Sequence, residues 1–286
     1  MDFCQIKEIL KNSIGTPYHE TDRCILFCGD SLVMQRKIDK EIFDAIITSP
    51  PYNIGKEYET IVSVDEYIKW SVDWIDGACK LLNNTGCLLL NLGYMSVADI
   101  GRAVPLPYIL WNKIPLFLNQ EIVWNYSAGV ACKKYLSPRN EKILWYVKNK
   151  ANYTFNLDAI RDPNVKYPNS KRHGKSRVNA LGKNPSDVWQ IAKVTTGENR
   201  SSKERTPHPC QFPVELINRL LLGFTNENDI VFDPFVGSGT TIESCLRNNR
   251  FCVGFEIQPK YCDIIKKRIN SLDTQVNNPM TEVNGL

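Results

Sequence analysis

Long apolar runs are missing from this 286-residue sequence, and their absence excludes a helical membrane protein. No segment approaches the roughly 20 consecutive apolar residues that cross a bilayer, and the most apolar stretch, residues 106–118, is interrupted by Asn112 and Lys113. The N-terminus also lacks the basic and then apolar pattern of a secretion signal. We therefore expect a cytoplasmic protein that does not associate with membranes.

Histidine is scarce, and no two cysteines have the spacing of a metal-binding pair. The chain has three histidines and ten cysteines, none of them in a Cys-x-x-Cys sequence. Most zinc sites use such spacings of Cys and His, so we predict no metal site. Cys28, Cys87 and Cys252 lie in apolar, strand-like segments, which favours reduced cysteines that fill the core of a cytosolic protein.

The overall composition is that of an ordinary globular protein, with 43% hydrophobic and 23% charged residues. A chain of this length can hold one large α/β domain with an insertion, or two domains. Composition therefore leaves the function open, and the motifs have to supply it.

The most informative motif is Thr-Ser-Pro-Pro-Tyr at residues 48–52, directly after an apolar, β-branched run at 43–47. Two consecutive prolines fix φ and remove two N–H donors. The loop therefore presents carbonyl oxygens, the Ser49 hydroxyl and the Tyr52 ring. A rigid set of acceptors beside a flat ring suits a planar base whose exocyclic NH2 group must be held. The alternative, from these five residues alone, is a Pro-Pro turn with a half-buried tyrosine.

A second motif, Asp-Pro-Phe-Val-Gly-Ser-Gly-Thr-Thr at residues 233–241, follows a short apolar strand predicted at 230–232. Its glycines would let backbone N–H groups approach a ligand where a helix begins near Thr240. The next predicted strand, 251–256, ends in Glu256, and an acid in this place binds ribose hydroxyls in nucleotide-binding α/β folds. The alternative is an ordinary βαβ unit, but the flanking residues and the later acid favour a nucleotide site.

Together these motifs resemble those of the amino DNA methyltransferases, which transfer a methyl group from S-adenosylmethionine to an exocyclic nitrogen. The catalytic block, Ser49, Pro50, Pro51 and Tyr52, precedes the cofactor block, which is similar to the permuted order of the family's β group. The resemblance covers residues 24–270 with a gap at 151–186. It implies the following cofactor-binding residues: Asp30, Asp233, Pro234, Phe235, Gly237, Ser238, Gly239, Thr240 and Glu256.

Two further blocks carry the resemblance. Residues 140–146 resemble a later core strand of the family, and residues 206–213 resemble the segment that packs over the methionine end of the cofactor. Phe212 stands where many relatives carry lysine, so no charge contact is expected at this position.

Positive charge is concentrated between Arg161 and Arg205, where eleven Lys or Arg face four Asp or Glu, although the whole chain carries only +4. A charge cluster alone usually marks a solvated loop. This one lies between the catalytic and cofactor halves, where the resembling family usually carries its target-recognition region. Basic residues would neutralise phosphates, and arginines commonly bind guanine edges. We therefore predict DNA contacts by the residues at its peak: Lys171, Arg172, Lys175 and Arg177.

The predicted fold is a doubly wound, mostly parallel α/β sheet with Rossmann-like methyltransferase topology and an inserted basic recognition region. Strands are expected near 24–28, 43–47, 86–92, 120–125 and 142–148, with helical stretches between them, the clearest at 64–82, and a short strand at 187–191. Both motifs would lie on the same rim, at the carboxyl ends of strands near the topological switch. We divide the chain into a lead-in (1–23), a catalytic half (24–150), the basic insertion (151–205), a cofactor half (206–270) ending in an amphipathic helix, and a loose tail (271–286).

The resemblance implies site-specific methylation of double-stranded DNA in a prokaryotic, nucleoid-associated enzyme. Ser49 and the Pro50 carbonyl would accept hydrogen bonds from the amino group, and Tyr52 would stack on a base flipped out of the duplex. In the family, serine before Pro-Pro goes more often with cytosine N4 than with adenine N6, so N4-methylcytosine is favoured and N6-methyladenine is the alternative. A cognate restriction endonuclease is a candidate partner. The oligomeric state and the recognised DNA word are not predicted.

Other functions remain open at this point. A nicotinamide-dependent oxidoreductase also uses a glycine turn, but this turn lacks the third glycine of the dinucleotide fingerprint and leaves residues 48–52 unexplained. A DNA-binding protein without catalysis would not need both an intact acceptor loop and a cofactor turn. RNA is a lesser alternative as substrate, because net charge does not separate the two nucleic acids.

Overall fold

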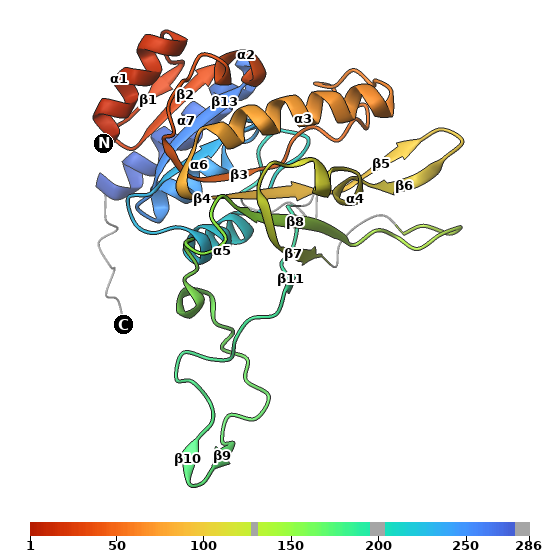
Figure 1. Cartoon of the computed structure of the whole chain (residues 1–286), viewed down its shortest axis with the longest axis vertical. Helices are drawn as coiled ribbons and strands as arrows, with labels where there is room; N and C mark the ends of the chain where they lie inside the picture. Colours follow the sequence, from red (N-terminus) through yellow and green to blue (C-terminus); the bar gives the residue numbers. More distant parts are fainter. Residues whose placement is uncertain (127–130, 195–203, 278–286) are drawn as a thin grey trace, which may run out of the picture.

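The computed structural model describes residues 1–126, 131–194 and 204–277 of the chain. Within these ranges the centre is a nine-stranded sheet with the order β1-β2-β13-β12-β3-β4-β8-β7-β11 (Figure 1). Its strands are β1 (His19–Glu20), β2 (Cys24–Cys28), β3 (Phe43–Thr48), β4 (Leu82–Leu92), β7 (Phe117–Asn125), β8 (Asn140–Val147), β11 (Val188–Gln190), β12 (Ile230–Asp233) and β13 (Phe251–Glu256).

The mostly parallel sheet predicted from the sequence is confirmed. Strands β2, β13, β12, β3 and β4 run parallel in this order, whereas β8 returns antiparallel to β4 and β7 is antiparallel to β8. The predicted strands near 24–28, 43–47, 86–92, 120–125, 142–148 and 187–191 all correspond to strands of the structure, with ends that differ by a few residues. Short, nearly continuous apolar runs form the central strands because both faces of the sheet are covered.

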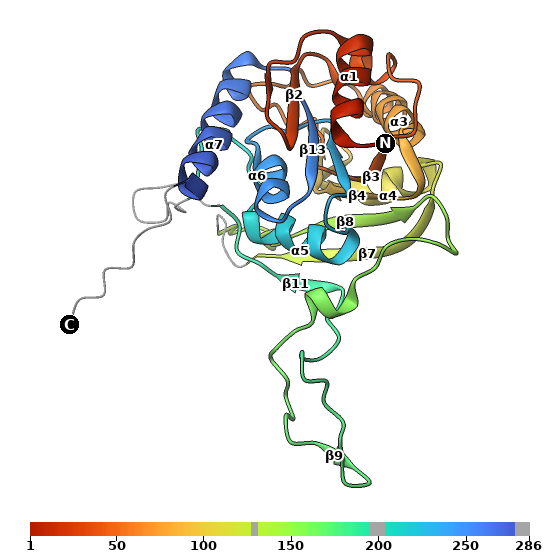
Figure 2. The ribbon, with the colours of Figure 1, turned by 90° about the vertical axis from the view of Figure 1, so that its left-hand side faces the viewer.

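Helices cover the two faces of the sheet (Figures 1 and 2). Their packing follows from alternation along the strands: Ile25 and Phe27 of β2 belong to one buried cluster, and Cys24 and Leu26 to the other. The first cluster includes side chains of α1 and α3, and the second includes those of α5, α6 and α7. The helices are α1 (Phe3–Ile14), α2 (Ser31–Gln35), α3 (Val64–Lys80), α4 (Leu106–Leu110), α5 (Val214–Phe224), α6 (Thr240–Arg247) and α7 (Pro259–Asn277), with short 3-10 helices at Trp111–Lys113 and Leu157–Ile160.

The order of strands reverses between β12 and β3, since the chain passes from β12 to β13 on one side and from β3 to β4 on the other. Ligands of doubly wound sheets bind outside the carboxyl ends of the strands at such a reversal. Residue 49 follows β3 at this point, and residue 234 follows β12. The fold therefore brings the two motifs to one place.

The segment between β4 and α4 differs from the expected helix. Residues 94–105 form the hairpin of β5 (Tyr94–Val97) and β6 (Gly101–Pro105), which projects from the sheet (Figure 1). Asp99, in its turn, has a φ of 60°, a conformation that aspartate tolerates better than most residues. The pairing of Tyr94 with Pro105 and of Met95 with Val104 across this turn takes the place of a helix.

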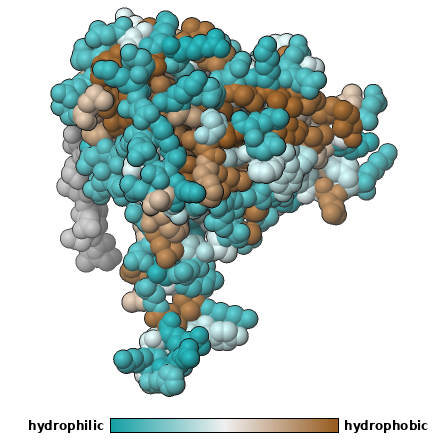
Figure 3. All heavy atoms as spheres, viewed as in Figure 1, coloured by the Kyte–Doolittle hydropathy of each residue, from teal (hydrophilic) through white to brown (hydrophobic). Residues whose placement is uncertain are grey.

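The basic insertion leaves the sheet after β8 and returns as β11, and its middle forms a long projection (Figures 1 and 2). We call residues 161–187 the basic arm. An isolated bridge between Asp162 and Lys183 closes its base, and its tip is the hairpin of β9 (Lys171–Arg172) and β10 (Lys175–Ser176). The two turn residues, His173 and Gly174, both have positive φ, at 49° and 77°, which matches the tight two-residue turn of a hairpin. The tip is strongly hydrophilic (Figure 3).

The C-terminal helix is longer than expected. Helix α7 runs to Asn277, past the predicted boundary at residue 270, because Leu272 continues the buried face that Ile265 and Ile269 begin. Residues 278–286 of the predicted tail and residues 195–203 of the basic insertion lie outside the described ranges. None of the helices in the described ranges has the length and apolarity of a membrane span.

Candidate active site

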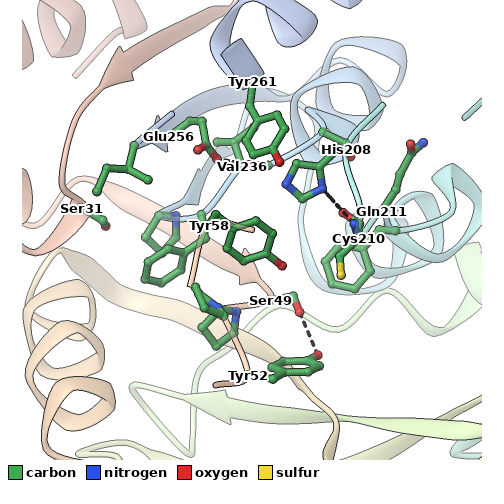
Figure 4. A pocket seen from close by; sticks show the side chains of 18 of the residues that line it. Ser31, Ser49, Tyr52, Tyr58, His208, Cys210, Gln211, Val236, Glu256 and Tyr261 are labelled. Carbon is green, nitrogen blue, oxygen red and sulfur yellow. Dashed lines mark hydrogen bonds between the residues drawn. The ribbon is translucent and has the colours of Figure 1, made fainter. Parts of the chain in front are cut away.

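A cavity of about 640 Å³ lies at the carboxyl ends of β3, β12 and β13. Its wall includes residues 49–52 of the acceptor loop, residues 234–238 of the glycine turn, and Glu256 (Figure 4). The prediction that both motifs lie on the same rim is therefore confirmed. Of the residues predicted for the cofactor, Asp233 and Gly239 do not line the cavity, whereas Asp30, Pro234, Phe235, Gly237, Ser238, Thr240 and Glu256 do.

Asp233 lies behind the turn and holds its shape. Its buried carboxylate accepts hydrogen bonds from Thr48 Oγ1 (2.7 Å), Thr241 Oγ1 (2.6 Å) and the Phe235 N–H (3.0 Å). Burial raises the pKa of Asp233 to about 6, although these three hydrogen bonds act in the opposite direction. Because Asp233 binds the end of β3 and the start of α6 at once, it fixes the acceptor loop relative to the glycine turn.

Glu256 faces the cavity from the end of β13 and is only 7% exposed. Its Oε2 accepts from the Gly237 N–H at 2.9 Å, and its Oε1 accepts from the Gln258 N–H at 2.8 Å. Burial raises the pKa of Glu256 to about 7. A Cβ atom added to Gly237 would lie 3.1 Å from two atoms of the His208 ring, and the φ of Gly237 is 55°. The positive φ therefore favours glycine at this turn, and a Cβ would in addition need the His208 ring to move by a few tenths of an ångström.

The start of α2 forms another part of the cavity wall. Asp30 caps the helix, with Oδ1 accepting from the Leu32 N–H at 2.8 Å. Asp30 and Ser31 both line the cavity, so the acid lies where a polar group of a bound molecule could reach it. On the glycine-turn side, Arg268 supports the turn from behind through hydrogen bonds to the Ser238 carbonyl (3.0 Å) and Thr240 Oγ1 (3.2 Å).

Aromatic side chains form a further part of the cavity wall (Figure 4). Tyr58 stacks on His208 with ring centroids 5.6 Å apart, and Tyr261 meets His208 edge to face at 4.3 Å. Burial lowers the pKa of His208, which keeps the ring neutral at physiological pH. The loop that carries Tyr58 is attached to α7, because Glu57 accepts hydrogen bonds from Lys260 Nζ (2.9 Å) and from the Tyr261 hydroxyl.

The acceptor loop is held rigidly from both sides. The Tyr67 hydroxyl of α3 donates to the Pro51 carbonyl at 2.9 Å. Glu59 accepts from four N–H groups of the loop, those of Tyr52 (2.7 Å), Asn53 (3.1 Å), Ile54 (2.9 Å) and Lys56 (3.1 Å). Prolines alone would fix only φ at two positions, so these contacts complete the rigidity that the sequence motif predicts.

At the end of the loop, four polar side chains form one hydrogen-bonded group. The Tyr52 hydroxyl lies 2.9 Å from Ser49 Oγ, 3.0 Å from Glu141 Oε2 and 2.7 Å from Asn91 Nδ2 (Figure 4). Asn91 Nδ2 also donates to Glu141 Oε2 at 2.5 Å. Burial, together with the nearby Glu141 charge, raises the pKa of Tyr52 far above its ordinary value, so the phenol is protonated.

Several of these residues were not identified from the sequence. Glu141 lies at the start of β8, a segment interpreted only as a core strand, and Asn91 lies inside the apolar run of β4. Gly93 backs the Tyr52 ring so closely that an added Cβ would lie 2.8 Å from Tyr52 Cε2. Trp124 and Lys193 add an aromatic and a basic side chain to the wall. The sequence contained one signal for these missed residues: Asn91 is a polar residue inside an apolar strand.

The four predicted DNA-binding residues lie apart from the cavity. Lys171, Arg172 and Lys175 are exposed on the hairpin at the tip of the basic arm, and Arg177 follows it. A second basic stretch, which sequence reasoning missed, precedes β8 and contacts the β5–β6 hairpin, where the Arg102 guanidinium lies 5.8 Å from the centre of the Tyr135 ring. It contains Lys133, Lys134 and Arg139, with the exposed side chains of Tyr135 (53%) and Leu136 (95%) between them. In the described part of the chain, no three His, Cys, Asp or Glu side chains gather as metal ligands would.

The chain matches the family model for DNA methylases, N6_N4_Mtase, over residues 43–267. It is 50% identical over 262 residues to the Type II methyltransferase M.ScaI of Streptomyces caespitosus, covering 92% of this chain and 86% of that protein. Its fold is similar to the PvuII DNA methyltransferase (cytosine-N4-specific), with a TM-score of 0.69, 17% identity and coverage of 92% and 94%. The M1.HpyAVI–SAM complex gives a TM-score of 0.59, 24% identity and coverage of 86% and 99%. At these identities the structural likeness shows the fold alone.

Proposed function

The chain belongs to the N6/N4 DNA methylase family, and from this membership we propose that it methylates the exocyclic N4 of a cytosine in double-stranded DNA, with S-adenosylmethionine as methyl donor. One observation carries the proposal: a single cavity joins the glycine turn and Glu256 at one end to the acceptor loop at the other. A methyl donor and an amino group would therefore meet inside it. This arrangement serves no purpose in a nicotinamide-dependent oxidoreductase.

The residues of the turn fit the cofactor. Glu256 offers carboxylate oxygens for ribose hydroxyls, and Asp30 with Ser31 lies on the adjacent wall. Gly237, with its positive φ and no side chain, suits a turn whose backbone lies against a bound ligand. When bound, S-adenosylmethionine supplies an electrophilic methyl group on a sulfonium sulfur, so the protein mainly has to position the partners and exclude water.

The acceptor loop would hold the amino group of a flipped base. The Ser49 hydroxyl and the Pro50 carbonyl would each accept one N–H, which aims the nitrogen lone pair and stabilises the positive charge that develops during transfer. Tyr52 would contact the face of the base, and stacking of this kind contributes about 1–3 kcal/mol per base. This offsets part of the few kcal/mol that unpairing and unstacking cost.

The choice of cytosine over adenine rests on the family resemblance alone, because Ser49 before Pro-Pro and a 208–213 segment with Phe212 in place of lysine both look more like the cytosine group. Both bases carry a conjugated amino group that a hydroxyl and a carbonyl can hold, so N6-methyladenine is the second candidate product. The basic arm would supply phosphate contacts, and a restriction endonuclease that recognises the same site would be the partner, as in a Type II system. The permuted order of the motifs supports the further proposal that the chain belongs to the β group.

The product can be identified directly. The purified protein is incubated with S-adenosylmethionine and unmethylated duplex DNA, and the DNA is digested to nucleosides and analysed by mass spectrometry. We expect N4-methyldeoxycytidine, and base-resolved mapping of DNA from expressing cells then gives the recognised word. N6-methyldeoxyadenosine alone would overturn the choice of base but not the enzyme class. Methylation of RNA and not of duplex DNA, or no methylation at all, would overturn the proposal.

A further inference from the structure

Glu141 ends a hydrogen-bonded chain that begins at Ser49, beside the proposed position of the amino group. The links are Ser49 Oγ to Tyr52 Oη (2.9 Å) and Tyr52 Oη to Glu141 Oε2 (3.0 Å). Asn91 Nδ2 contacts both Tyr52 Oη (2.7 Å) and Glu141 Oε2 (2.5 Å). Ser49, Tyr52 and Glu141 line the cavity, whereas Asn91 is 2% exposed and lies behind them.

One arrangement of protons connects Ser49 to Glu141 when Glu141 is ionised, although the Tyr52 hydroxyl also lies 3.3 Å from the Asn91 carbonyl oxygen, a second acceptor. An amide NH2 only donates, and a carboxylate only accepts. In this arrangement Asn91 donates to both partners, and the Tyr52 hydroxyl donates to Glu141 Oε2 at 3.0 Å, the nearer of its two acceptors. The remaining lone pair of Tyr52 Oη then accepts the Ser49 hydroxyl proton. Ser49 Oγ is left with free lone pairs and no proton to offer the cavity, so it acts as an acceptor for an amino group.

We propose that Glu141 is the final acceptor of the proton that the amino group loses, and that Tyr52 and Ser49 relay this proton to it. The inference rests on the proposed function and deepens it. As the N–C bond forms and the donor's S–C bond breaks, the alkylated nitrogen becomes cationic. One N–H proton passes to Ser49 Oγ, the Ser49 proton passes to Tyr52 Oη, and the Tyr52 proton passes to Glu141 Oε2. The product amine is neutral and Glu141 ends as a carboxylic acid.

The surroundings of Glu141 suit this role. Burial raises the pKa of Glu141, which strengthens it as a base, while the hydrogen bonds from Asn91 and Tyr52 favour its ionised form. The other titratable groups that act electrostatically with Glu141 are Lys193 after β11, Tyr94 of β5 and Tyr126 after β7. Lys193 favours the carboxylate, and burial raises the pKa of both tyrosines, so at neutral pH they add no negative charge.

A purely structural role would predict different behaviour. In that case Glu141 would only anchor the Tyr52 hydroxyl, and a neutral isostere that keeps the hydrogen bonds would serve equally well. In a relay, the proton needs a basic terminus, so Glu141→Gln interrupts it without removing the side chain. Tyr52→Phe interrupts the same relay one step earlier and keeps the ring that would contact the base. In this relay Glu141 receives the proton through Tyr52 and not directly from the amino group.

The experiment compares single-turnover methylation by wild type, Glu141→Gln, Tyr52→Phe and the double variant. Proton transfer by a positioned group contributes roughly 10²–10⁴-fold, so we expect the rate of each single variant to fall about 100-fold or more. Two breaks in one relay are not additive, so the double variant should be no slower than the slower single variant. Glu141→Asp should recover part of the rate. Glu227→Gln, which neutralises an exposed acid outside the cavity, is the matched control and should keep the wild-type rate.

Two further measurements separate the relay from a loss of structure. At saturating cofactor, the wild-type rate should fall at low pH as Glu141 is protonated, and the part of this acid limb that belongs to Glu141 should be absent in Glu141→Gln. Any part that belongs to Asp233 and Glu256, which also titrate in the site, should remain in both proteins. Infrared difference spectra should show a carboxylic-acid band that titrates in wild type, is missing in Glu141→Gln and shifts in Tyr52→Phe. Cofactor and DNA affinities should change little. A wild-type rate in Glu141→Gln or Tyr52→Phe, additive losses, or an unchanged acid limb would overturn the relay. An inactive wild-type enzyme would instead overturn the proposed function.

Discussion

Cofactor affinity is expected to depend on pH through Glu256. The proposed role of this carboxyl is to accept hydrogen bonds from ribose hydroxyls, which the ionised form does far better than the neutral acid. Burial at 7% exposure raises its pKa to about 7, and the charge of the nearby Asp233 adds to this effect. The group therefore titrates within the range in which the enzyme would work.

The size of the effect follows from this pKa. With a pKa of about 7, roughly 90% of Glu256 is ionised at about pH 8 and roughly 10% at about pH 6. If only the ionised form binds the ribose, the Kd for the cofactor rises about tenfold over this interval. Stability should move in the opposite direction to affinity. The folded pKa lies above the unfolded value of 4.5, so the folded state binds more protons between them, and stability falls by about 3 kcal/mol as pH rises through this window.

The assay is a fluorescence titration with S-adenosylmethionine and with S-adenosylhomocysteine, because Trp70 and Trp74 both line the cavity. Glu256→Gln is the matched variant, since it has nearly the same shape and no titratable carboxyl. It should bind the cofactor weakly, and the part of the pH dependence that belongs to Glu256 should disappear. Ionisation of the ligand's own amino group affects both proteins equally and cancels in the difference. Identical pH slopes for wild type and Glu256→Gln would refute the reasoning.

The remaining predictions concern the base pocket and the basic arm. Tyr52→Ala should nearly abolish methylation and leave the Kd for the cofactor close to that of wild type; wild-type turnover would contradict the proposed contact with the base. Gly93→Ala should lower the single-turnover rate with little change in Tm. The added Cβ would lie 2.8 Å from Tyr52 Cε2 and must displace the Tyr52 ring. An unchanged rate would show that the position of this ring is not critical for methylation. Neutralising the four basic residues of the arm should weaken DNA binding. The slope of log K against log salt concentration should become shallower by about 0.9 for each phosphate that the arm no longer neutralises. An unaltered slope would place the DNA-binding surface elsewhere. The residues to replace are Lys171, Arg172, Lys175 and Arg177.

The sequence predicted the features of the site that depend on neighbouring residues. The strands β3 and β12 could be predicted because each is an apolar run that ends in a turn signal, and the two motifs follow them directly. Parallel strands then place both motifs on one rim whatever the details of the loops. The predicted end of α7 was too early in the chain. The polar composition after residue 270 suggested that the helix had ended, but the buried Leu272 extends its apolar face.

The sequence did not predict Glu141, because its place depends on pairing between distant segments. Strand β8 returns antiparallel to β4, with Ile143 opposite Asn91 and Lys142 opposite Leu92. This register carries Glu141 just beyond the end of β4, next to Gly93 and the Tyr52 hydroxyl. Neither the direction of β8 nor its register is encoded in a local pattern. A shift of one residue would turn Glu141 to the opposite face of the sheet.

Asp233 shows why a residue of the cofactor motif need not contact the cofactor. It is 2% exposed and outside the cavity wall, yet it joins the two halves of the site through Thr48, the last residue of β3, and Thr241, in the first turn of α6. The base-binding loop and the cofactor turn come from segments far apart in the chain, so the distance between methyl donor and amino group depends on how these segments are fastened together. A misplacement of about 1 Å can cost a factor of about 100 in rate. Asp233, a buried acid that accepts hydrogen bonds from three donors, joins the two segments at the strand reversal itself. The need to fix the distance between them explains why an acid stands at this position without lining the cavity.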